Sequence, residues 1–142
     1  MAVERTLTII KPDATAAGHV GEIITDIEKA GFRILSIHKL HLTQVQAEAF
    51  YQVHRERPFF KDLVKFMTEG DVVPIALEQE GAISKLREIM GVTDSKKAAP
   101  GTIRNKFGTN IERNAIHGSD SPETAAFEVA FFFNQSELNR VS

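Results

Sequence analysis

The sequence predicts an α+β sandwich of the split βαβ kind, in which helices cover a four-stranded antiparallel sheet. Three observations predict this class. Segments rich in β-branched residues alternate along the chain with segments whose apolar residues recur at helical spacing. Glycine, proline or a capping residue separates most of these segments. The 142 residues suffice to bury one core, so we expect a single domain over residues 1–142.

The first strand and the first helix are both marked by the residues that end them. Residues 6–10 are rich in β-branched side chains, and Pro12 follows closely and stops the strand. Apolar residues then recur at helical spacing between Val20 and Ile27, and Gly31 supplies a C-terminal stop. We therefore expect a strand followed by a helix that packs on the sheet.

A second strand and a capped helix are expected next. Residues 32–42 return to strand character. Their alternation predicts two faces, with Leu35 and Ile37 on one and Ile34 and Leu40 on the other. Thr43 and Gln46 then form a capping-box pattern, which predicts a helix through Val53.

The middle of the chain predicts a helix, a strand and another helix. Apolar spacing marks helices over residues 60–67 and 83–90, and a glycine closes each of them. Between them, residues 72–77 alternate as a third strand. Pro74 is awkward inside that strand, because proline removes a donor from the ladder.

The last part of the chain predicts a loop, a short strand and a helix. Residues 93–101 have loop composition, and residues 114–117 are a candidate fourth strand. Ser121 suits an N-cap and Pro122 the first helical position. The stripe expected to face the core is Ala126, Val129, Ala130 and Phe133. The polar tail after Asn134 is expected to be only partly ordered. This order of elements indicates a ferredoxin-like split βαβ sandwich.

Composition narrows the functional class. The formal net charge of −2 gives no reason to expect a nucleic-acid or anionic-membrane partner, so any anion site must be a local cluster of Lys and Arg. The absence of cysteine excludes disulfides, thiolate metal sites and a cysteine nucleophile. With no apolar signal core and no run of membrane-spanning length, we expect a soluble cytoplasmic protein.

Several familiar sites are disfavoured by the motifs. The sequence contains neither G-x-x-x-x-G-K-[ST] nor G-x-G-x-x-G, which argues against a P-loop or a dinucleotide fold. His38 and His41 are three positions apart on a predicted strand and point to opposite faces, which disfavours zinc. A triad of Ser119, His117 and Asp120 is also disfavoured, because no separate element aims the serine at the imidazole.

The segment of residues 114–121 is the strongest functional signal. It places His117 just ahead of a helix N-terminus, where unpaired backbone N–H groups attract anions such as phosphate. A histidine that meets phosphate can act as a base, a hydrogen-bond donor or a phosphate acceptor. A structural histidine in a turn is the alternative.

Five segments in register resemble one known family. Residues 114–120 match the pattern Asn-x-x-His-Gly-Ser-Asp of the nucleoside diphosphate kinases. Residues 8–13 resemble the family's N-terminal strand and lysine, and residues 57–60 its substrate-binding arm. Arg87, Thr93 and residues 100–104 follow in the family's order, and the resemblance extends from about Glu4 to Phe133.

The resemblance implies transfer of the terminal phosphate of a nucleoside triphosphate, mainly ATP, to a nucleoside diphosphate. The reaction would run as a ping-pong cycle through a phosphohistidine at His117. Glu128 matches the glutamate that orients the imidazole in the family. Tyr51 matches a tyrosine near the histidine, and Ser119 a serine that supports the site. Read alone, Glu128 would be an exposed helix residue and Tyr51 a packing aromatic.

The resemblance also implies the nucleotide-binding residues. Charge stabilisation dominates phosphoryl transfer, so the cations matter most. Arg87 and Arg104 would hold the phosphates, Thr93 would donate a hydroxyl, and Lys11 would reach the ribose hydroxyls and the transferring phosphate. Asn114 would contact the ribose, while Phe59 and Ile111 would enclose the base between them. Mg²⁺ is expected to arrive with the nucleotide phosphates rather than in a protein cage.

The resemblance also implies an assembly. The short C-terminus resembles bacterial members, and we expect a homo-oligomer, either a tetramer or a hexamer. Three departures from the family pattern bear on assembly more than on catalysis: Asp71 in place of a usual proline, Pro74 in the next strand, and Asp94-Ser95 in place of Asn-Pro.

Two other functional classes were weighed against the enzyme. A non-catalytic nucleotide-binding regulatory module of the same fold would be expected to lose His117 or a phosphate cation, and all are present. An RNA-binding sheet predicts a basic face with exposed aromatics, which the net charge and the helical spacing of the phenylalanines oppose. The sequence therefore favours the enzyme, with no nucleic-acid partner.

Overall fold

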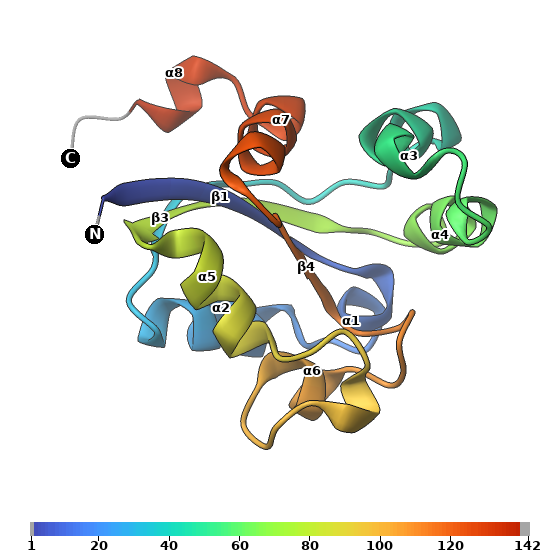
Figure 1. The fold of residues 1–142 in the computed structure, drawn as a ribbon, viewed down its shortest axis with the longest axis horizontal. Helices are drawn as coiled ribbons and strands as arrows, with labels where there is room; N and C mark the ends of the chain where they lie inside the picture. The colour runs from blue at the N-terminus through green and yellow to red at the C-terminus, as the bar shows by residue number, and fades with distance from the viewer. Residues whose placement is uncertain (1, 140–142) are drawn as a thin grey trace.

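The computed structural model describes residues 2–139. Its elements form a sheet with helices on both faces (Figure 1). In chain order they are β1 (Val3–Ile10), α1 (Pro12–Ala16), α2 (Val20–Lys29), β2 (Arg33–Ile37), α3 (Gln44–Phe50), the 3₁₀ turn η1 (Gln52–His54), α4 (Phe60–Met67), β3 (Val73–Glu80), α5 (Ala82–Met90), the 3₁₀ turn η2 (Ser95–Lys97), α6 (Ile103–Phe107), β4 (Ile116–Gly118), α7 (Pro122–Phe132) and α8 (Gln135–Leu138).

The sheet has four strands in the order β2-β3-β1-β4. Each neighbouring pair is antiparallel, as predicted. Strand β1 lies in the middle and pairs along its whole length with β3. The short edge strand β4 pairs with the C-terminal part of β1, where Ile9 lies opposite His117. The strand that carries His117 is therefore fixed against the best-buried strand of the fold.

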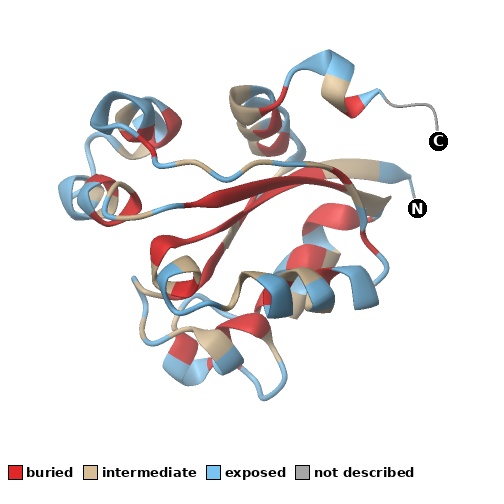
Figure 2. Cartoon of the chain, turned by 180° about the vertical axis from the view of Figure 1, so that it is seen from behind, coloured by how far each residue is buried: buried red, intermediate tan, exposed pale blue. Residues whose placement is uncertain are grey.

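Two apolar clusters fill the two sides of the sheet. One lies under α3, α4, α7 and α8 and includes Leu7 and Ile9 of β1. The other lies under α1, α2, α5 and α6 and includes Ile10 and the β4 residue Ile116. The strands are accordingly buried at the centre, while the helices expose their outer faces (Figure 2). No helix among residues 2–139 has the length and apolar character to span a bilayer.

The second strand ends earlier than predicted. It stops at Ile37, and its register against β3 shifts between Ile34 and Ser36. Leu35 and Leu40 then pack on the same cluster, and Ile37 is exposed, so the predicted alternation is wrong beyond the shift. The predicted capping box of Thr43 is present, but α3 gives way to the 3₁₀ turn before Val53.

Pro74 lies inside β3, a central strand, with its nitrogen turned away from β1 and toward the side of β2. The carbonyl of Pro74 accepts a hydrogen bond from the backbone N–H of His38 at 3.1 Å, so its nitrogen faces the same way. Strand β2 has already ended at Ile37 on this side. The missing donor therefore interrupts no ladder bond with β1.

The C-terminal helices differ from the prediction in two ways. Helix α7 buries Ala125 and Val129 but exposes Ala126 and Ala130, because its inward face also carries Glu128. The tail is helical again in α8, where Leu138 is buried. The rest of the predicted tail, residues 140–142, lies outside the described residues.

Candidate active site

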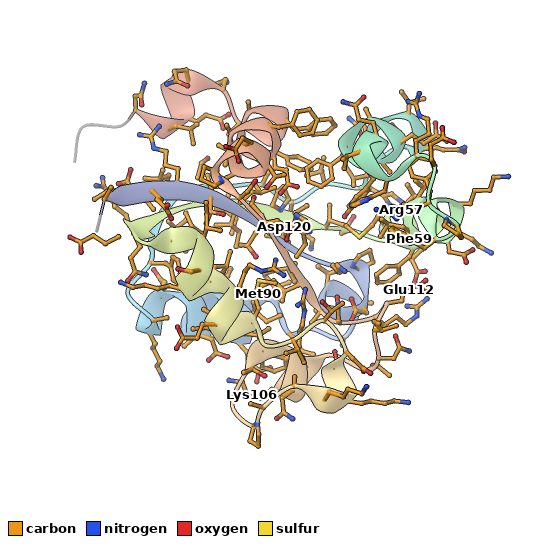
Figure 3. The ribbon with its side chains drawn as sticks, viewed as in Figure 1. Arg57, Phe59, Met90, Lys106, Glu112 and Asp120 are labelled. Carbon is orange, nitrogen blue, oxygen red and sulfur yellow. The ribbon has the colours of Figure 1, made fainter. Side chains whose placement is uncertain are left out.

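His117 lies on β4 with its neighbours facing the opposite side of the sheet. Ile116 is buried in the cluster under α5, and alternation turns the imidazole toward α3 and α7. Gly118 allows β4 to approach α5, because a Cβ there would lie 2.6 Å from the Sδ of Met90. Figure 3 labels Met90 on α5 beneath this strand. The glycine after the histidine is therefore required by packing.

Glu128 and Ser119 hold the imidazole from one side. The Nε2 of His117 lies 2.8 Å from Glu128 Oε1, and the Ser119 hydroxyl donates to the same carboxylate oxygen at 2.8 Å. Ser119 is itself fixed to β1, where its N–H donates to the Leu7 carbonyl at 3.1 Å. A carboxylate can only accept, so in the neutral imidazole Nε2 carries the proton and Nδ1 keeps its lone pair. Only 19% of the histidine side chain is exposed.

Aromatic rings wall the imidazole on the α3 side. The ring centroids of Phe50 and Tyr51 lie 5.8 and 6.4 Å from that of His117, both edge to face. The Tyr51 hydroxyl is buried and has no hydrogen-bond partner among the described residues. Burial and then the charge of Glu128 raise the pKa of Tyr51, so the phenol stays neutral and can donate. The two aromatic rings therefore fix the plane of the His117 imidazole and leave its Nδ1 unoccupied.

Lys11 lies directly after β1 and forms the buried positive charge of the site. Only 8% of the residue is exposed, and its Nζ donates to Asn114 Oδ1 at 2.7 Å. Burial and then the nearby charge of Arg104 lower the pKa of Lys11 to about 8. Retaining a charge here costs stability, which is typical of functional sites.

Asn114 connects Lys11 to the loops that border the site. Its Nδ2 donates to the backbone carbonyls of Thr93 at 3.0 Å and Ile111 at 3.1 Å. Both amide hydrogens are thus used, which leaves only a lone pair of Oδ1 for a ligand. Asn114 therefore fixes these loops, and the ribose contact that the family resemblance implies stays a prediction.

Two arginines stand on the α5 side of β4. Arg104 is 6% exposed and donates to the carbonyls of Gly91 at 3.0 Å and Ile116 at 2.9 Å. Burial and then the charge of Arg87 lower the pKa of Arg104 to about 10. Arg87 is more exposed and donates to Asp120 Oδ1 at 2.7 Å. Asp120 thus takes up one nitrogen, Nη1, of a guanidinium that a phosphate could bind.

The remaining predicted residues lie at the open edge of the site. Thr93 is exposed, and the side chains of Phe59 and Ile111 are two of the large apolar groups that face solvent. Phe59 stands at the start of α4 and Glu112 on the loop before β4 (Figure 3). A salt bridge between Arg113 and Glu69, at 3.0 Å, joins this loop to the turn that follows α4. Among the described residues, Phe59 shares its ring contact with His54 rather than with His117, and Ile111 is exposed, so the two form a separate part of the site.

Two acidic residues, for which no role was predicted, also contact the residues of the site. Asp120 pairs with Arg87, and Asp13 accepts a hydrogen bond from the Ala115 N–H at 3.0 Å. Both stand inside the matched motifs, but their partners are distant along the chain. The spacing of residues could not identify those partners.

The departures from the family pattern have local explanations. Asp71 accepts a hydrogen bond from the Thr15 hydroxyl through its backbone carbonyl and lies near Lys39 and His41. Asp94 caps the short turn η2 by accepting from the Lys96 N–H at 3.0 Å. Neither residue contacts His117 or its carboxylate.

An oriented imidazole, with Lys11, Arg87 and Arg104 bonded to the backbone of residues next to it, suits an enzyme that handles phosphate, a phosphotransferase. The chain belongs to the nucleoside diphosphate kinase family, since the family profile described as "Nucleoside diphosphate kinase" matches residues 4–138. A nucleoside diphosphate kinase from Coxiella burnetii is 57% identical over 138 residues, 97% of this chain and 99% of that protein. One from Anaeromyxobacter sp. is 55% identical over 139 residues, 98% of this chain and 95% of that protein.

Solved structures of the same family share the fold. A nucleoside diphosphate kinase from Aquifex aeolicus superposes with a TM-score of 0.94 at 50% identity, covering 96% of this chain and 99% of the other. A halophilic one from Halobacterium salinarum, solved in complex with CDP, gives 0.93 at 36% identity, covering 99% and 94%. The predicted family, fold class and kinase activity are confirmed, and the non-catalytic module is not favoured.

Proposed function

We propose that this nucleoside diphosphate kinase works through a phosphoenzyme formed on Nδ1 of His117. The observation that carries the proposal is the 2.8 Å contact between Nε2 and Glu128, which leaves Nδ1 as the nitrogen with a free lone pair. Nδ1 attacks the terminal phosphorus of the triphosphate, the bond from that phosphorus to the bridging oxygen breaks, and the diphosphate leaves. A terminal oxygen of the acceptor diphosphate then attacks the same phosphorus and frees the histidine.

Glu128 and Ser119 would act as orienting groups in this cycle. As the ring becomes phosphorylated, its charge grows, and the carboxylate on Nε2 stabilises it. Ser119 keeps the carboxylate in place through its 2.8 Å hydrogen bond. Neither group needs to move between the two half-reactions, which suits a cycle in which the same histidine is loaded and unloaded.

The cations and Tyr51 would bind the transferring phosphate. Lys11, Arg87 and Arg104 supply positive charge around a reaction centre whose charge lies on the phosphate oxygens. The Tyr51 hydroxyl is buried without a partner among residues 2–139, so a phosphate oxygen would satisfy it. Thr93 would add its hydroxyl at the outer end of the phosphate chain.

The base would lie between Phe59 and Ile111 at the open edge. Both side chains are large, apolar and exposed, at 48% and 64%. Contact with the face of the ring tolerates every base, which fits acceptors of several kinds. The relative from Halobacterium salinarum, solved with CDP, supports a pyrimidine as one of them.

We propose Mg²⁺ as the cofactor, carried by the nucleotide. Among the described residues, no cluster of three acidic or histidine side chains is placed to hold a metal, whereas the cations suit phosphate oxygens. Bound to two phosphates, the ion would neutralise charge on the leaving group. Arg87 and Arg104 would then orient the remaining phosphate oxygens.

Assembly and location complete the proposal. We propose a homo-oligomer, a tetramer or a hexamer, of a single kinase domain spanning residues 1–142 that works in the cytoplasm on nucleoside triphosphates and diphosphates. Sedimentation analysis of the purified chain distinguishes the two assemblies by mass. Fractionation of the producing cells tests the location.

Labelling tests the proposed mechanism. The protein is mixed with γ-³²P-ATP and Mg²⁺, and GDP or CDP is then added. We expect an acid-labile, base-stable phosphoenzyme that transfers its label to either diphosphate. His117→Ala should take up no label, while His41→Ala, a change at an exposed histidine beside Thr68 and Asp71, should behave as the wild type. Labelling and turnover of His117→Ala would refute the proposal.

A further inference from the structure

Ala115, two residues before His117, has a backbone conformation that alanine rarely adopts. Its φ is +73°, the one positive value outside glycine among the described residues. The Ile116 N–H donates to the Asn114 carbonyl at 2.9 Å and closes a three-residue turn around it. A γ-turn with positive φ at its centre is strained. Some other contact must hold Ala115 in this form.

Both backbone groups of Ala115 are held by one distant segment. Its N–H donates to Asp13 Oδ2 at 3.0 Å, and its carbonyl accepts from the Lys11 N–H at 2.8 Å. The segment from β1 into α1 thus lies against the turn that leads into β4 (Figure 1). Ala115 is fully buried, so no water replaces these partners.

The turn controls where the functional side chains point. Before it, Asn114 faces Lys11 and the carbonyl of Thr93. After it, Ile116 enters the strand that carries His117. If residue 115 were extended, the chain would turn differently, and either the Asn114 side chain or the strand with His117 would point elsewhere. The strain is therefore stored where the lysine and the histidine are brought together.

We propose that Asp13 is a positioning residue of the active site, whose carboxylate holds the Ala115 amide and thereby keeps the strained turn between Asn114 and His117. This inference rests on the proposed function for its activity readout. If Asp13 only stabilised the fold, its carboxylate would be unfavourable, since Oδ1 is buried without a partner among the described residues and loses its hydration. Burial also raises the pKa of Asp13, which makes the charge costly to keep.

A rescue experiment separates positioning from charge and from folding. Asp13→Ala removes the acceptor, and we expect the rate of phosphoenzyme formation to fall about tenfold or more. Glycine accepts a positive φ without strain. In an Ala115→Gly background, Asp13→Ala should therefore slow phosphoenzyme formation by a smaller factor. This factor should be no more than about a third of the factor measured when Ala115 is present. Asp13→Asn retains an acceptor without the charge and should stay within a few fold of the wild type.

A second readout does not depend on the activity. Hydrogen exchange of the Ala115 amide, followed by NMR, should speed up in Asp13→Ala and stay slow in Asp13→Asn. Equal rate losses in Asp13→Asn and Asp13→Ala would overturn the proposal, because the charge beside Lys11 would then be the cause. A loss that Ala115→Gly does not reduce would also overturn it. If label appears on another residue while the amide exchanges as expected, the proposed function fails and the hold on the turn stands.

Discussion

Replacing Lys11 with methionine should change how stability depends on pH, in a way that only a buried charge explains. In the absence of nucleotide, the native state retains the Lys11 charge below pH 8 in a nearly dry place. Lowering the pKa from 10.5 to about 8 corresponds to about 3 kcal/mol of native-state cost at neutral pH. Methionine keeps most of the side-chain volume and removes that cost.

The sign follows from proton binding. Between pH 8 and 10.5 the unfolded chain holds a proton on Lys11 that the native state has released, so wild-type stability rises with pH in that window. Relative to Lys11→Met, the wild type should therefore gain most of about 3 kcal/mol between pH 7 and pH 10.5. At pH 7 the variant should be equal or up to about 2 kcal/mol more stable, because losing the hydrogen bond to Asn114 costs about 1–3 kcal/mol.

Urea unfolding at pH 7, 8.5 and 10 measures this difference, with Lys61→Met, at an exposed lysine, as the matched control. Both Lys11→Met and the wild type must be free of phosphate and nucleotide, since an anion would restore the charge. Parallel pH curves for the two proteins would refute the reasoning. Nucleotide turnover of the variant should be lost at every pH.

Three further substitutions test neighbouring parts of the site. Tyr51→Phe should lower the phosphoryl-transfer rate while raising the free energy of unfolding by about 1 kcal/mol, because the hydroxyl is buried unpaired; equal kcat values would contradict this. Gly118→Ala should cost about 1–3 kcal/mol in thermal unfolding, because the new Cβ would lie 2.6 Å from the Sδ of Met90, and the double variant with Met90→Ala should lose less stability than the two single losses added together. Asp120→Asn should lower the KM for nucleotide about two- to fivefold by freeing Arg87, and a raised KM would show that Asp120 positions the arginine instead.

The order of the strands and main helices was predictable because each is long enough to show its period. Val20 to Ile27 and Phe60 to Met67 are examples, and their bounds match α2 and α4 closely. The short helix Ile103–Phe107 was not predicted, since five residues carry too little periodicity. Its Thr102 cap was the available signal. The early end of β2 was also hidden, because a shifted register leaves no mark in composition.

From the residues alone, only the helix start after His117 was predictable, because Ser121 and Pro122 mark it. The roles of Ser119, just after β4, and of Glu128 on α7 came from the family resemblance. The contact between Lys11 and Asn114 spans 103 residues, and no spacing rule leads to it. Only the family resemblance placed those two residues together.

The role of Asp13 was predicted neither from the spacing of residues nor from the family resemblance. Its role depends on the φ of Ala115, a backbone angle that ordinary alanine in the sequence does not reveal. A glycine at that position would have signalled the turn. Strained non-glycine residues are thus found from coordinates, and their partners become candidates for function.

The most direct test of the central claim identifies the phosphorylated nitrogen. The ¹⁵N-histidine-labelled protein is loaded from ATP, and phosphorus–nitrogen coupling is measured by NMR on the intact phosphoenzyme. Since Glu128 occupies Nε2, the account predicts phosphate on Nδ1 of His117, with Nε2 still protonated. Phosphate on Nε2, or on any other residue, would contradict it.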